Sequence, residues 1–154
     1  MRALWFFLHV FGFILWIGGA LAVMAMGVGG KRERLEDQGL VVRLQALVYR
    51  MLIGPGALVT VVSGFVLTLQ MYGQATAVGL SHGLMAMQGL GLIAAIVVFV
   101  VALPTSAKLA RLEPIGADAA PFHGLRRRLI SAGMGSGVLA LLALVTGVLY
   151  RYRG

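Results

Sequence analysis

Between Arg50 and Lys108 the chain contains no charged residue. A helix needs about 20 mainly apolar residues to cross a bilayer, so this stretch has room for two membrane spans and a short link. Two further apolar runs lie at Ala3–Val28 and at about 129–150. The sequence therefore predicts an all-α fold, an integral membrane bundle of four helices.

Composition supports a membrane protein and excludes several chemistries. The chain is 60% hydrophobic and 12% charged, whereas soluble domains are about 25% charged. Its net charge is +8, but the basic residues flank the apolar runs, so membrane lipids rather than nucleic acid are the expected partner. There is no cysteine, which excludes disulfides, thiolate metal sites and covalently attached haem and leaves non-covalent haem or a His/Met metal site.

The expected boundaries follow from hydropathy and from helix-breaking residues. We expect a single transmembrane domain over 1–154, with helices at about 3–28, 51–71, 79–103 and 129–150 and links at 31–50 and 104–128. Pro55 is expected to kink the second helix near its start, and Pro104 to end the third. Leu40, Leu44 and Leu47 recur at helical spacing, which predicts an amphipathic helix in the second half of the first link. The first run is longer than the apolar region of a signal peptide, about 7–15 residues, so we expect it to be retained.

The distribution of basic residues predicts the orientation. Ten lie in the two long links: Lys31, Arg32, Arg34, Arg43, Arg50, Lys108, Arg111, Arg126, Arg127 and Arg128. Only three, Arg2, Arg151 and Arg153, belong to the opposite side. The positive-inside rule then places both links in the cytoplasm and both termini outside. The expected location is a cell membrane, specifically a bacterial inner membrane.

Of the three histidines, two are expected in the outer half of the membrane. His9 lies inside the first apolar run, where an imidazole is costly without a partner and is a functional candidate by default. His82 lies near the start of the third expected helix, which runs parallel to the first. Their depths match if that helix begins near 77, whereas His82 lies at the interface if the helix begins at His82 itself. His123 falls in a cytoplasmic link.

Two imidazoles at similar depth on neighbouring helices can hold the iron of a b-type haem between them. His9 and His82 are the candidate ligands. Gly12 and Gly89 would let the porphyrin approach the backbone, and Trp16 would line its inner edge. The alternative is that both histidines are hydrogen-bonded packing residues.

A copper site is a further alternative. Thioether and imidazole ligands suit Cu(I), and Met71, His82, Met85 and Met87 could supply them together with His9. His82 and Met85 share a helix face at i, i+3, whereas Met87 lies on another face. Methionine is also an ordinary apolar filler.

The segment Leu8–Val23 resembles the first helix of small four-helix membrane proteins around the copper-resistance protein CopD and of HemJ-type protoporphyrinogen oxidases. Both share an opening L-H followed by W-x-G-G or W-x-x-G, which here is Leu8-His9 and then Trp16 to Gly19. The resemblance implies a haem-binding or copper-handling bundle with His9 as a ligand. HemJ-type enzymes also use a lysine in the third helix and an arginine after the glycines. This chain has neither, with Ala20–Ala22 after the glycines, so oxidase activity is not expected.

Three functions remain open at this point. The first is a haem protein for electron transfer or haem handling, the second a copper-handling protein, and the third a cofactor-free structural subunit. No hydrolase or nucleotide motif is present, so a redox or accessory subunit of a larger membrane complex is favoured over a stand-alone enzyme. Gly133 and Gly137, like Gly79 and Gly83, have the spacing that allows close helix contact. That contact is either internal or the seam of a homodimer.

Overall fold

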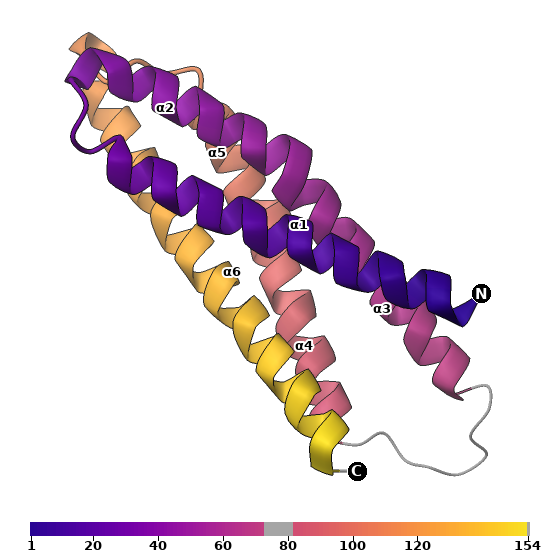
Figure 1. Cartoon of the computed structure of the whole chain (residues 1–154). Helices are drawn as coiled ribbons and strands as arrows, with labels where there is room; N and C mark the ends of the chain where they lie inside the picture. The colour runs from indigo at the N-terminus through magenta and orange to yellow at the C-terminus, as the bar shows by residue number, and fades with distance from the viewer. Residues whose placement is uncertain (73–81, 154) are drawn as a thin grey trace.

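The computed structural model describes residues 1–72 and 82–153, apart from the side chains of residues 71, 72, 82 and 150–153. All regular structure in this part of the chain is helical (Figure 1). The elements are α1 (Arg2–Gly29), α2 (Leu35–Val48), the π-helical turn η1 (Tyr49–Ile53), α3 (Gly54–Tyr72), α4 (His82–Ile96), a second π-helical segment η2 (Val97–Ala102), α5 (Leu103–Leu109), a short 3₁₀ turn η3 (Gly116–Asp118) and α6 (Ala119–Arg153).

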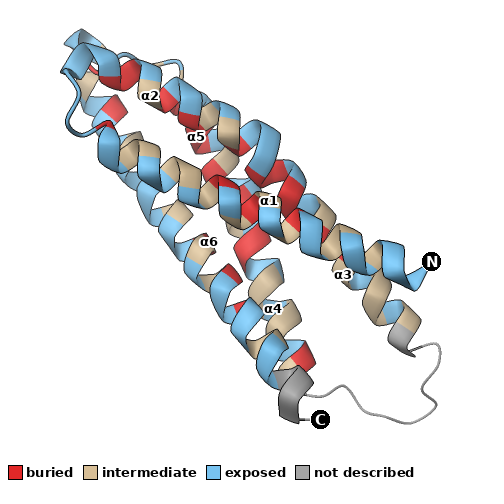
Figure 2. Ribbon diagram, viewed as in Figure 1, coloured by how far each residue is buried: buried red, intermediate tan, exposed pale blue. Residues whose placement is uncertain are grey.

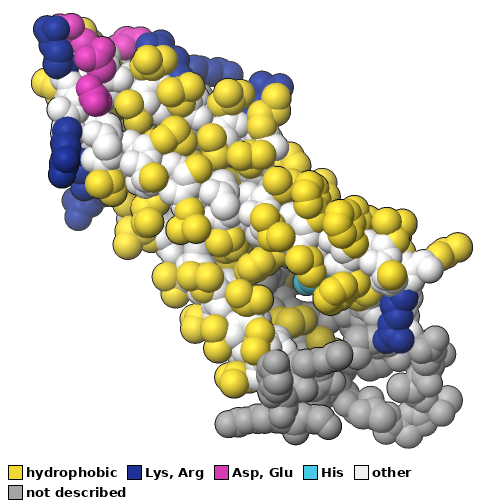
Figure 3. Space-filling model, viewed as in Figure 1, with side chains coloured by type: hydrophobic (Ala, Val, Ile, Leu, Met, Phe, Trp, Pro, Cys, Tyr) yellow, Lys and Arg dark blue, Asp and Glu magenta, His cyan; other side chains and the backbone are white. Residues whose placement is uncertain are grey.

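Four helical stretches are long and apolar enough to cross a membrane: Arg2–Gly29, Leu35–Gln70, Gly83–Leu109 and Gly116–Leu149. Large apolar side chains cover the outside of the bundle, while Lys, Arg, Asp and Glu gather toward the end formed by α2 and α5 (Figure 3). Soluble monomers rarely expose such a continuous apolar surface. The four helices expected from hydropathy are confirmed, and they indicate a multi-pass membrane protein.

The helices form two tightly packed pairs, α1 with α3 and α4 with α6. The pairs meet in a core that includes Tyr49, Ile53, Val98 and Ala102. Figure 2 shows most buried positions between the middle of the bundle and the α2 end. Toward the N-terminus and the C-terminal end of α6, which lie at the same end, the pairs separate (Figure 1).

The helix expected to stop at Pro104 continues to Leu109, so that boundary is wrong. Proline lacks an N–H and clashes with the carbonyl four residues earlier, which usually interrupts an α-helix. Here η2 ends two residues before Pro104, and η1 ends two residues before Pro55. A π-turn shifts the hydrogen-bond partner by one residue. Each proline therefore lies just after a turn in which the α-helical hydrogen-bond pattern has already changed, and the helix continues past it.

The amphipathic helix expected in the first link is present as α2 and runs through η1 into α3, which moves the start of the second span from 51 to Leu35. Its apolar stripe, Leu40, Leu44 and Leu47, is exposed on the bundle surface. The buried face instead carries Gln38, Val42 and Gln45, and the Gln45 amide donates a hydrogen bond to the carbonyl of Val23 (2.9 Å). The leucine stripe of α2 thus faces outward.

The last helix begins at Ala119, ten residues before the expected Leu129, so most of the second link is also helical. Pro121 does not prevent this because it lies in the first turn, where its missing N–H has no helical partner. Within α6, a Cβ at Gly133 would lie 2.8 Å from the hydroxyl of Tyr49, whereas Gly137 has open space. Gly133 therefore serves packing inside the chain. Of the second glycine pair, Gly79 and Gly83, the first lies outside the described residues.

Candidate functional site

A cavity of about 840 Å³ lies between the two helix pairs. Small-molecule sites usually have volumes of about 300–1,000 Å³. Its walls are mainly apolar and come from α1, α3, α4 and α6, and no charged residue of the described chain lines it. Several rim residues are exposed on the membrane-facing surface, among them Phe6, Val10, Phe65 and Leu144. A histidine is visible in a hollow of that surface in Figure 3.

His9 is fixed in the cavity wall by a hydrogen bond to helix α3. Its Nδ1 lies 2.9 Å from the main-chain carbonyl oxygen of Thr60. A carbonyl can only accept, so Nδ1 carries the proton in this contact, and in a neutral imidazole Nε2 then carries the lone pair. No hydrogen bond to Nε2 is found among the described residues. The arrangement leaves a nitrogen lone pair available for a ligand or a metal.

Gly64 and Ser63 on α3 contact the imidazole ring of His9. A Cβ at Gly64 would lie 2.9 Å from Cε1 of His9, closer than real Cβ contacts. The hydroxyl of Ser63 lies 3.3 Å from Nδ1, and it donates a short hydrogen bond of 2.5 Å to the carbonyl of Val59. The ring therefore rests directly on the α3 backbone, and its tautomer is set by that backbone.

A second polar contact links α3 and α4 beside the cavity. The Gln88 amide donates to the hydroxyl of Thr68 (2.5 Å), and Thr68 donates to the carbonyl of Gly64 (2.9 Å). Polar side chains inside a bilayer are retained where they hydrogen-bond across helices. This bond links the two helix pairs beside the cavity.

The five residues expected around a haem have different locations. His9 and Trp16 line the cavity, and Trp16 is only 2% exposed. Gly12 instead packs against α3, because a Cβ there would lie 2.8–2.9 Å from atoms of Thr60 and Gly56. Gly89 is exposed with open space around it. The structure gives these two glycines no contact with the cavity.

His82 is the first residue of α4 in the described chain. Residues 73–81 lie outside the described residues, so both expected depths of His82 stay predictions. Its side chain lies outside the described residues, so its pairing with His9 stays a prediction. His123 lies near the start of α6, exposed and away from the cavity, with its ring edge-on to Phe122.

The methionines expected to bind copper do not gather in the cavity. Met85 is 53% exposed and does not line it, and the side chain of Met71 lies outside the described residues. Met87, which the sequence argument placed on another face of the helix, does line the cavity. Among the described residues, no three His, Cys, Asp or Glu side chains are grouped as they would be around a metal ion.

The α3 residues that hold His9 were not among the sequence predictions. Their signal is a row of small residues four apart, Gly56, Thr60, Gly64 and Thr68, which lies along one helix face. Such small-xxx-small rows mark close helix contacts in membranes. The row predicts that another helix packs on this face of α3. Only the fold shows that this helix is α1.

No protein-family model, curated protein or solved structure matches this chain. The resemblance of Leu8–Val23 to CopD-like and HemJ-type proteins therefore rests on its motif residues alone.

Proposed function

We propose that this multi-pass membrane protein binds a b-type haem in the cavity, with His9 as an axial ligand, and acts in electron transfer or haem handling. One observation carries the proposal. The Nδ1–H of His9 is hydrogen-bonded to the Thr60 carbonyl at the wall of an apolar cavity. Metal-ligating histidines typically donate their second ring N–H in this way, which fixes the ring and raises the basicity of the other nitrogen.

The lining of the cavity supports a large, flat, apolar ligand. Four aromatic side chains from two helices line the cavity together with His9: Phe6, Phe13, Trp16 and Phe65. Apolar surroundings limit access of water and help set the redox potential of a bound haem. When bound, haem supplies one-electron chemistry. The protein's own residues bind it, orient it through His9 and exclude water.

The visible absorption spectrum of detergent-purified protein tests this function. We expect a Soret band that shifts on reduction with dithionite, and about one haem per chain by extraction, as expected for a single haem site with His ligation. Copper bound without a Soret band would support a copper-handling protein instead. A protein carrying neither would support a structural subunit.

We also propose that the termini lie outside the cell and that the α2–α5 end faces the cytoplasm. Ten of the thirteen basic residues belong to the segments expected inside, and the positive-inside rule then gives this orientation. Alkaline phosphatase fused to the C-terminus is expected to be active, and green fluorescent protein fused there to be dark. Fluorescence without phosphatase activity would reverse the orientation.

A further inference from the structure

We propose that Met87 is the second side chain that would hold the haem iron, together with His9. This inference rests on the proposed function and adds a second protein ligand for the haem iron. Haem iron in proteins is held by His, Met, Cys or Tyr side chains. Among the described residues that line the cavity, only His9 and Met87 belong to this group.

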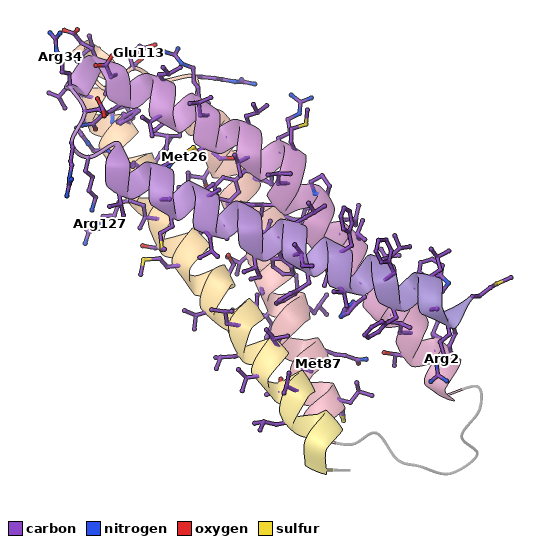
Figure 4. The ribbon with its side chains drawn as sticks, in the orientation of Figure 1. Arg2, Met26, Arg34, Met87, Glu113 and Arg127 are labelled. Atoms are coloured by element: carbon purple, nitrogen blue, oxygen red, sulfur yellow. The ribbon has the colours of Figure 1, made fainter. Side chains whose placement is uncertain are left out.

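The two side chains come from opposite helix pairs, and each packs on a glycine of the partner helix in its own pair. His9 comes from α1 and rests on Gly64 of its partner α3. Met87 comes from α4 and rests on Gly147 of its partner α6, because a Cβ at Gly147 would lie 2.6 Å from the Met87 sulfur. Figure 4 shows Met87 on α4, in the half of the bundle away from Glu113. The cavity lies between these pairs, so each pair contributes one ligand.

Met87 and His82 cannot take the same position at one iron. They are five residues apart on α4, which separates them by about 7.5 Å along the axis and about 140° around it. Met87 lines the cavity in the described structure, which favours it over His82. The neighbouring polar side chain, Gln88, already donates its amide to Thr68.

Absorption spectra and redox titrations of the haem-loaded full chain test this pairing. Met87→Leu keeps side-chain volume nearly constant, so we expect haem content to be retained through His9. The spectrum should change from six-coordinate low-spin to five-coordinate high-spin. Met87→His should restore a low-spin spectrum with a lower midpoint potential, because methionine ligation raises the potential. Met85→Leu, an exposed position off the cavity, is the matched control and should leave the spectrum unchanged.

Gly147→Ala provides a second test at little cost to folding. The new methyl group would meet only the Met87 side chain, so it should displace the sulfur and increase the high-spin fraction. Gly137→Ala, where the space is open, should have no effect.

The Met87 assignment is wrong if the Met87→Leu variant keeps the wild-type haem spectrum while the His82→Ala variant becomes high-spin. That result would leave the haem function intact. Wild-type protein that binds no haem overturns both.

Discussion

Replacing His9 by alanine is expected to lower haem affinity at least about tenfold, a loss of about 1.4 kcal/mol. His9 supplies the nitrogen lone pair at the cavity wall, and its orientation depends on the hydrogen bond to Thr60. The measurement is the haem-to-protein ratio after purification, together with titration of the apoprotein with hemin. His123→Ala is the matched control, because His123 is exposed and far from the cavity, and it should keep the full haem content.

A chemical rescue separates loss of the ligand from loss of the fold. His9→Gly leaves a space the size of the imidazole against Gly64, and free imidazole added to this variant should restore the Soret band. The ligand assignment fails if His9→Ala retains haem at the wild-type ratio with an unchanged spectrum.

Replacing Gly56 by alanine is expected to destabilise the α1–α3 pair by roughly 2–3 kcal/mol, toward the upper end of typical overpacking costs. A Cβ at Gly56 would lie 2.7 Å from the backbone nitrogen of Trp16 and 2.8 Å from the carbonyl oxygen of Gly12. These are backbone atoms, so the helices themselves must move apart. Because Trp16 lines the cavity, haem retention should fall as well.

The free energy of unfolding in mixed detergent micelles measures this effect. Gly18→Ala is the matched control on α1, since nothing lies within 4 Å of its Cβ position, and it should change stability by less than about 0.5 kcal/mol. Equal stability of the two variants would show that the close approach of α1 and α3 is not present in the protein.

Hydropathy and charge alone were sufficient to predict four long apolar helices, because the energetic demand of a bilayer is strong and uniform along each span. The boundaries at Pro104 and at Leu129 could not be predicted from local rules. Proline breaks a regular α-helix, but here the π-helical segment η2, which packs against α6, precedes Pro104. A rule about one residue cannot include that contact.

For the site, too, the sequence predicts which residue needs a partner, whereas the identity of that partner depends on tertiary contacts. His9 was singled out because an imidazole inside an apolar span needs a partner, and the structure gives it one. The partner, the Thr60 carbonyl, depends on the register of α1 against α3. Whether Met85 or Met87 faces the cavity depends on the rotation of α4, which its nearly uniform hydrophobicity does not specify.

The position of iron in crystals of the purified protein shows whether His9 holds a haem. In an anomalous difference map collected at the iron absorption edge, we expect one peak in the cavity between α1 and α4. The peak should lie about 2 Å from Nε2 of His9, the usual metal–imidazole distance, while Nδ1 keeps its bond to the Thr60 carbonyl. A cavity that contains lipid without iron, or an iron peak bound away from His9, would contradict this expectation.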